Sequence, residues 1–251
     1  MYYYIFDPSQ GAKEYERSAQ IKELLSNLGI AGEMTSPAPG KSVEDLVELA
    51  VAKRYSTIVA VGGMELINRV ARALEPHDVV FGIIPTQAHP DISRLIGVDD
   101  WKSAAEQLKL RRWKNIRLGI INDTICFLTP ARFNLAPDQE YTLITPQFTT
   151  SGVGGSVSIT PVRSETDETS CLVVNVEFEK GKKGFMSTLF HKGGNVDLSS
   201  RFTVETLSLE TEPSVVVEIA GTPLSQTPVQ CTTQEKVLKL IVAKGTPDLG
   251  A

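Results

Sequence analysis

The stretch Thr57-Ile58-Val59-Ala60-Val61-Gly62-Gly63 decides the fold class of this chain. It begins as an unbroken apolar and β-branched run and ends in a pair of glycines. A continuous apolar run is typical of a parallel strand that is buried on both faces, whereas a half-exposed strand alternates polar and apolar residues. The stretch therefore predicts a central parallel strand that ends in a glycine turn.

Strand and helix signals alternate on both sides of this run. The aromatic segment Tyr2–Phe6 has high β propensity and stops at Asp7-Pro8. Apolar residues at helical spacing follow, and Ser42 stands where the N-cap of a further helix is expected. This order predicts a doubly wound parallel α/β sheet. We expect helices over 15–28, 42–54, 64–74, 92–96 and 101–110, and further strands over 33–36 and 79–84.

The second half of the chain has a different character. Helix signals stop near Leu118, and short strand-like segments separated by Gly, Pro, Asn and Ser take their place. We therefore expect an α/β domain at residues 1–117 and an antiparallel, β-sandwich-like domain at residues 118–251, whose last strand is free to return toward the first domain. The expected strands cover 119–128, 141–145, 155–160, 171–179, 185–191, 202–209, 215–220 and 237–242.

Composition excludes several classes of function. The chain has 251 residues and a net charge of −5, so it has no overall electrostatic attraction to nucleic acid or to an anionic membrane. Its cysteines are far apart and form no CxxC pair, which argues against a zinc site or a disulfide framework. No apolar run approaches the roughly 20 residues of a membrane span, and the N-terminus lacks the basic stretch of a secretory signal. We expect a cytoplasmic protein with no transmembrane segment and no nucleic-acid partner.

Some local features leave alternatives open. The basic run that contains Arg111, Arg112 and Lys114 is either a patch for an anionic headgroup or phosphate, or a solvated helix end that leads into a linker. The lysines within residues 180–183 raise the same choice, because a charged hairpin tip also opposes aggregation. His89 is either a new ligand or acid–base group, or a polar loop residue.

Several motifs resemble those of the diacylglycerol kinase and NAD kinase superfamily, on its bacterial lipid kinase side. Residues 7–11, Asp-Pro-Ser-Gln-Gly, resemble the opening Asn-Pro-x-Ser-Gly turn of that family, and Gly62-Gly63 resembles the start of its Gly-Gly-Asp-Gly-Thr loop. Further matches follow in the family's order at Thr35, Leu66–Val70, Gly82–Pro85, Asp91–Gly97 and Val215–Leu224. The resemblance implies a fold built for ATP-dependent phosphoryl transfer to a lipid. It places residual nucleotide contacts at Asp7, Thr35, Gly62, Gly63, Glu65 and Asp91.

The sequence departs from the family at the positions that serve phosphate and catalysis. Met64, Glu65 and Leu66 stand where the first family loop has Asp, Gly and Thr. The second loop has lost its glycines and Thr within residues 87–90, where a proline also removes a backbone donor. Ala220-Gly221-Thr222 stands in place of Asp-Gly-Glu, which the resemblance identifies as the source of the general base. A Thr hydroxyl is not a base near neutral pH.

These matched losses predict a non-catalytic binding or scaffold protein, without a cofactor, that holds a small molecule or lipid in a cleft between the domains and pairs with a second copy or another protein. An active lipid kinase with divergent loops is the alternative. Asp7, Glu65, Asp91 and Glu218 would then supply metal contacts and the base, with ATP and Mg²⁺ as cofactors. A purely structural subunit is a third possibility. The shape of the loop at residues 62–66 separates the first two, because phosphates need its space.

Overall fold

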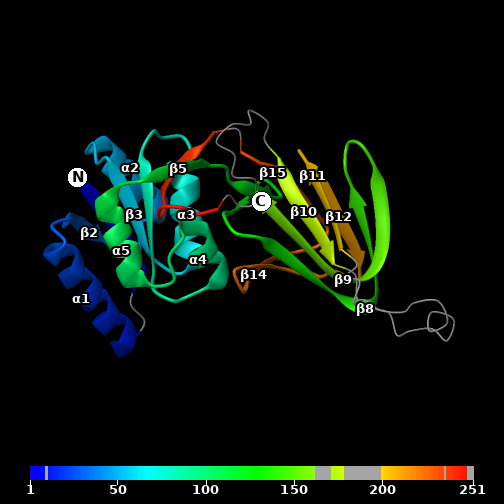
Figure 1. Ribbon diagram of the computed structural model, residues 1–251, viewed down its shortest axis with the longest axis horizontal. Helices are drawn as coiled ribbons and strands as arrows, with labels where there is room; N and C mark the ends of the chain where they lie inside the picture. Colours follow the sequence, from blue (N-terminus) through cyan, green and yellow to red (C-terminus); the bar gives the residue numbers. More distant parts are fainter. Residues whose placement is uncertain (9–10, 162–170, 178–198, 235, 248–251) are drawn as a thin grey trace.

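The computed structural model describes residues 1–251 except 9–10, 162–170, 178–198, 235 and 248–251. Within this part of the chain, helices gather around a mainly parallel sheet, and an antiparallel sheet lies beside it (Figure 1). The prediction of a parallel α/β layer followed by an antiparallel layer is therefore confirmed. Among the described residues, no helix combines the length and the apolar character that a membrane span requires.

The first sheet has the strand order β2-β1-β3-β4-β16-β5. Every residue of β3 is buried, as its apolar sequence predicts. Val59 and Val61 pack with α1 and α5 on one face, whereas Ile58 and Ala60 pack with α2 and α3 on the other. The strands are β1 (Tyr2–Phe6), β2 (Glu33–Thr35), β3 (Thr57–Gly62), β4 (Val80–Pro85), β5 (Trp113–Ile116) and β16 (Leu238–Ile241), and the helices are α1 (Ala12–Asn27), α2 (Val43–Ala52), α3 (Met64–Leu74), α4 (Pro90–Ile96) and α5 (Trp101–Leu110).

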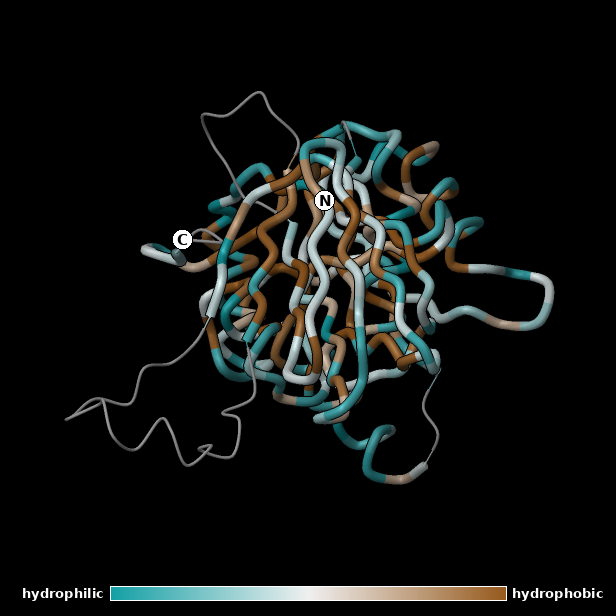
Figure 2. The backbone as a smooth tube through the Cα atoms, turned by 90° about the vertical axis from the view of Figure 1, so that its right-hand side faces the viewer, coloured by the Kyte–Doolittle hydropathy of each residue, from teal (hydrophilic) through white to brown (hydrophobic). Residues whose placement is uncertain are grey.

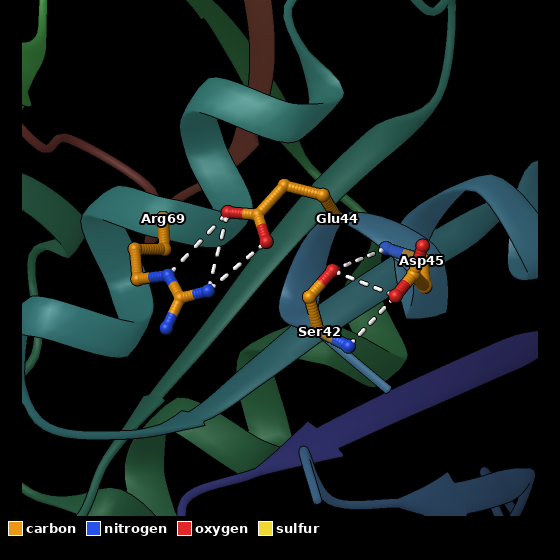
Figure 3. Close-up of polar contacts among 4 residues, drawn as sticks. All are labelled: Ser42, Glu44, Asp45 and Arg69. Carbon is orange, nitrogen blue, oxygen red and sulfur yellow. Dashed lines mark hydrogen bonds and ion pairs between the residues drawn. The ribbon is translucent and has the colours of Figure 1, made fainter. Parts of the chain in front are cut away.

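A side-chain cap fixes the start of α2. The Ser42 hydroxyl accepts the Asp45 N–H at 3.1 Å, and the Asp45 carboxylate accepts the Ser42 N–H at 2.8 Å (Figure 3). These bonds satisfy backbone donors that have no partner within the helix. Glu44, in the same turn, pairs with Arg69 of α3 at 3.0 Å, so the two helices are also tied across the sheet face.

The second sheet runs β11-β10-β9-β8-β12-β15-β6-β7, with β13 paired to both β8 and β14. Hydrophobic residues, brown in Figure 2, concentrate in its strands, whereas the connecting turns are mainly hydrophilic. The strands are β6 (Gly119–Ile121), β7 (Ile125–Phe127), β8 (Ala131–Ile144), β9 (Thr149–Pro161), β10 (Leu172–Glu177), β11 (Ser199–Val204), β12 (Leu207–Glu212), β13 (Val216–Ile219), β14 (Thr222–Gln226) and β15 (Val229–Thr233).

Several expected strands have different bounds in the structure. The single strand expected over 119–128 is a tight hairpin, because Asn122 and Asp123 both adopt positive φ angles (49° and 56°) in the turn that the Thr124 N–H closes on the Ile121 carbonyl oxygen. The strand expected over 202–209 is divided between β11 and β12, and β14 and β15 were not foreseen. The basic run that contains Arg111, Arg112 and Lys114 leads directly into β5, an edge strand of the first sheet, and not into a linker. The strand expected over 185–191 and the lysine loop at 180–183 lie outside the described residues.

Helix α3 joins the two sheets. Arg72 donates hydrogen bonds to the carbonyl oxygens of Asp123 and Thr124 in the β6–β7 hairpin. One hydrophobic core runs from the α2–α3 face of the first sheet into the second sheet, where it includes Phe127 and Phe133. This packing fixes the second sheet against the helical layer and positions the β13–β14 hairpin near the ends of the parallel strands.

Candidate functional site

A cavity of about 550 Å³ opens where the carboxyl ends of β1, β3 and β4 meet the β13–β14 hairpin. Its walls come from Asp7 after β1, the segment 63–65 at the start of α3, the segment 86–89 after β4, and Ala220 with Thr222. Each of the three segments where the sequence departs from the lipid kinase pattern therefore contributes residues to one cavity. Residues of the first two turns of α1 complete the wall, and Arg17 holds them there by donating to the Thr86 carbonyl oxygen at 2.8 Å.

The Asp7 carboxylate accepts a hydrogen bond from the backbone N–H at the start of α3. Its Oδ2 accepts the N–H of Gly63, the N-cap of the helix, at 2.6 Å. Gly62 permits this approach, because a Cβ at that position would overlap the Asp7 carboxylate. Burial raises the pKa of the Asp7 carboxyl, the Gly63 N–H opposes this rise, and the nearby Glu65 and Glu14 carboxylates raise the pKa further. An acidic group thus stands where a helix N-terminus would otherwise present a donor to an anion.

We expect Asp7→Asn to stabilise the protein at pH 7. The ionised carboxylate carries a folding penalty, because its folded-state pKa is raised above the unfolded value. This penalty is fully present above the folded-state pKa, shrinks as the pH falls from the folded-state pKa toward the unfolded-state pKa, and is absent below both. Asn removes the charge and keeps an oxygen that accepts the Gly63 N–H. Urea unfolding should therefore show a higher midpoint for the variant at pH 7 and a shrinking advantage on acidification.

The matched control is Asp138→Asn, which removes an exposed carboxylate from β8. It should change the free energy of unfolding by less than about 0.5 kcal/mol at any pH. Equal behaviour of the two variants would show that the Asp7 carboxylate carries no special penalty.

The first turn of α3 divides its side chains between the cavity and the core. The helix begins directly after Gly63, so no extended glycine loop separates it from β3. Met64 is 6% exposed and lines the cavity, and Glu65 is exposed at the same wall. Leu66 is 3% exposed and belongs to the hydrophobic core. Met64 therefore borders the expected phosphate space, while Leu66 packs away from it and the cavity remains open.

A buried ion pair anchors α4, the helix that follows the cavity-lining segment 86–89. Asp91, in the first turn of α4, is 3% exposed, and both of its carboxylate oxygens accept hydrogen bonds from the guanidinium of Arg132 on β8, one of them at 2.7 Å. His89 caps the same helix, since its Nδ1 accepts the Asp91 N–H at 3.2 Å. Asp91, a predicted nucleotide contact, is thus committed to Arg132. Sequence reasoning missed Arg132, which stands in an ordinary strand pattern.

The β13–β14 hairpin closes the cavity opposite α3. Ala220 and Gly221 form its turn with positive φ angles of 48° and 76°. A Cβ added to Gly221 would lie 3.7 Å from His89 Nε2, so the hairpin tip stands against the loop after β4. Where the family carries carboxylates, this turn presents a methyl group and, at Thr222, a hydroxyl.

Ala220→Gly should raise the free energy of unfolding by about 1 kcal/mol, because glycine enters the left-handed region without the steric cost that a Cβ brings. Chemical denaturation measures the gain. Ala104→Gly, at a buried position inside α5, should instead lower the free energy of unfolding by about 1 kcal/mol, because helix interiors disfavour glycine. A destabilised Ala220→Gly variant would contradict the turn geometry.

The remaining predicted residues lie outside the cavity wall. Thr35 ends the edge strand β2 and is not among the lining residues. Glu218 lies on β13 directly opposite Arg132. Arg111 donates to the hydroxyls of Ser56 and Thr57, near the amino end of β3. Among the described residues, no group of three or more His, Cys, Asp or Glu side chains is placed to hold a metal ion.

Comparisons with known proteins agree with this architecture. The family model for the diacylglycerol kinase catalytic domain matches residues 2–121. A diacylglycerol kinase from Bacillus anthracis str. Sterne shares 17% identity, a TM-score of 0.67 and 98% coverage of both chains. Another structure from that strain, provisionally identified as a diacylglycerol kinase, gives 14% identity, a TM-score of 0.70 and again 98% coverage of both. No curated protein matches the chain.

Proposed function

We propose that this chain is a non-catalytic member of the diacylglycerol kinase-like lipid kinase family, which binds a ligand in its cavity without transferring phosphate from ATP. The observation that carries the proposal is the Asp7 carboxylate on the Gly63 N–H, beside Glu14 and Glu65. We infer a doubly wound arrangement for the first sheet. In such sheets ligands bind outside the carboxyl ends of the strands, which is where this cavity opens.

The carboxylates at the start of α3 oppose a polyphosphate at this end of the cavity, whereas the cations Lys13 and Arg17 line the wall on α1. A helix N-terminus ordinarily attracts phosphate through free N–H groups and the helix dipole. At the start of α3 the N–H of Gly63 is already bonded to a carboxylate, and Glu65 adds a negative charge in the first turn. Like charges at such separations repel strongly in a partly buried site. A magnesium ion would have to offset this repulsion, but the described residues offer no cluster of three acidic or imidazole ligands.

The carboxylates that the kinase alternative requires are engaged elsewhere. Asp91 is paired with Arg132, and Glu218 faces the same guanidinium across the β8–β13 ladder. Neither Ala220 nor Thr222 offers a base for a lipid hydroxyl. An active kinase would therefore depend on Asp7 and Glu65, both of which line the cavity at the start of α3, where the family resemblance leads us to expect the phosphates rather than the acceptor.

Binding and turnover measurements test the proposal. The protein is heated with and without millimolar ATP and Mg²⁺, and it is separately incubated with radiolabelled ATP and diacylglycerol in mixed micelles. We expect no shift in Tm and no labelled lipid, while an active diacylglycerol kinase in parallel gives both. At 1 mM ATP, a Kd of about 10 μM would add about 2.7 kcal/mol of stability, which a thermal shift detects readily.

Variants decide how a positive result is interpreted. Turnover that is lost in Glu65→Gln and kept in Asp138→Asn would establish the kinase alternative and overturn the proposal. Turnover that survives Glu65→Gln, Asp7→Asn and Thr222→Ala alike would point to a contaminating kinase, and purification to constant specific activity would then settle the result. If Asp7→Asn gains a Tm shift with ATP that the wild-type protein lacks, the carboxylate is the barrier to nucleotide, as proposed.

A further inference from the structure

The segment Lys109–Trp113 forms an exposed ridge between α5 and β5. All its residues are exposed, with Leu110 at 51% and Trp113 at 47%. The remaining three are cations: Lys109, Arg111 and Arg112. We call this segment the α5–β5 ridge. It concentrates positive charge and two large apolar side chains on a chain whose net charge is −5.

The strand register places the Trp113 side chain on one side of the sheet. Trp113 pairs with Ile241, whose side chain belongs to the core beneath α1 and α5, so Trp113 lies on the face that α5 covers. Lys114 pairs with Leu240, which belongs to the core on the opposite face. Lys114, the third residue of the predicted anion patch, therefore lies on the opposite face from Trp113. The ridge keeps Arg111 and Arg112 of that patch and contains Leu110 and Trp113 in addition.

Parts of the ridge are held in place by the fold. Arg111 is the left-handed C-cap of α5, and its guanidinium lies 5.8 Å from the centre of the Tyr2 ring and bonds the hydroxyls of Ser56 and Thr57. On the strand side, Lys239 lies 5.3 Å from the centre of the Trp113 ring. The ridge is therefore a preformed surface that needs little ordering when it meets a partner.

We propose that the α5–β5 ridge docks this protein peripherally on an anionic lipid bilayer. Tryptophan rings favour the headgroup level of a membrane, and leucine reaches the acyl boundary below it. Cations beside them are attracted by anionic headgroups, at a gain of about fivefold in binding per residue. A nucleic acid would engage the cations but would leave Leu110 exposed to water. The ridge lies near the amino end of β3 and the cavity at its carboxyl end, so docking leaves the cavity accessible.

Tryptophan fluorescence tests the docking surface directly. The chain has two tryptophans, and Trp101→Phe makes Trp113 the sole reporter. Vesicles of phosphatidylcholine with 30% phosphatidylglycerol should shift its emission to shorter wavelength, and acyl-brominated lipid should quench it. Vesicles of phosphatidylcholine alone should give neither effect at the same lipid concentration. Raising the salt from 50 to 500 mM should weaken the binding, because headgroup charges are screened.

Sedimentation with the same vesicles compares matched variants of the full chain. Lys109→Gln/Arg112→Gln should bind roughly 25-fold more weakly, from the loss of two ridge cations. Lys41→Gln/Arg201→Gln removes the same charge from exposed positions elsewhere and should bind within about twofold of the wild type. Leu110→Ser/Trp113→Ser should weaken binding with no loss of charge. The proposal fails if anionic vesicles do not bind, if both charge variants weaken binding equally, or if vesicles bind without changing the Trp113 emission. Unchanged circular dichroism spectra confirm that the variants are folded.

Discussion

Arg132→Met is expected to lower the free energy of unfolding by about 3 kcal/mol, the low end of the range for a broken buried ion pair. The Asp91 carboxylate is 3% exposed and would lose both of its guanidinium bonds, whereas Arg132 itself is 38% exposed, which moderates the loss. Glu177 and Glu218, which also act on Arg132, would lose their counter-charge. Urea unfolding at pH 7, followed by fluorescence and by circular dichroism, measures the effect and tests for two-state behaviour.

A double-mutant cycle assigns this loss to the pair. Arg132→Met combined with Asp91→Asn should recover most of the stability, because no uncompensated charge then remains in the α4–β8 contact. Arg132→Lys should fall between the wild type and Arg132→Met, since one ammonium cannot reproduce the two parallel bonds of a guanidinium. Arg201→Met, at an exposed position of β11, should change stability by less than about 0.5 kcal/mol. If Arg132→Met behaves like Arg201→Met, the ion pair contributes nothing to the fold.

Leu66→Thr, which restores the residue of the family loop, is expected to cost about 3 kcal/mol. The side chain is 3% exposed in the core that connects the sheets, so the change leaves a void and buries a hydroxyl. Leu66→Val is the matched control, because Val has the shape of Thr without the hydroxyl and nearly the same helix propensity. We expect Val to cost about 1 kcal/mol, and the difference between the two variants to report the buried hydroxyl.

The Leu66 result also bears on the proposed function. A catalytic loop cannot be rebuilt here by exchanging side chains one at a time, because position 66 now belongs to the hydrophobic core. If Leu66→Thr proves as stable as the wild-type protein, Leu66 is not packed as described and a loop with a free hydroxyl is accessible to this chain.

Local sequence signals were sufficient for β3 and for the starts of the helices α2 and α3. The apolar run of β3, the glycines after it and the Ser42 cap all act through neighbouring residues, and each appears in the structure as expected. The meeting of Asp7 with Gly63 also follows from parallel strands, whose carboxyl ends share one edge. These contacts depend on periodicity and on strand direction, which a single sequence contains.

The contacts that the sequence could not reveal are non-local. Arg132 stands 41 positions from Asp91, and nothing within β8 marks it as the partner of a helix in the other layer. The β5 pairing was missed because an edge strand of polar and basic residues has no burial pattern. The β6–β7 turn did carry a signal, the Asn122-Asp123 dipeptide, since both residue types tolerate positive φ.

The position of β16 affects the order in which the protein can fold. This strand lies between β4 and β5, yet it follows the whole second sheet in the chain. During synthesis from the N-terminus, β4 therefore has no neighbour on that side until residues 238–241 leave the ribosome. Until then the first layer exposes an open sheet edge, which is where chains pair wrongly with one another. The first sheet is complete only after the strands of the second sheet have been synthesised. Folding of the first sheet therefore depends on that of the second, which the chain inserts between β5 and β16.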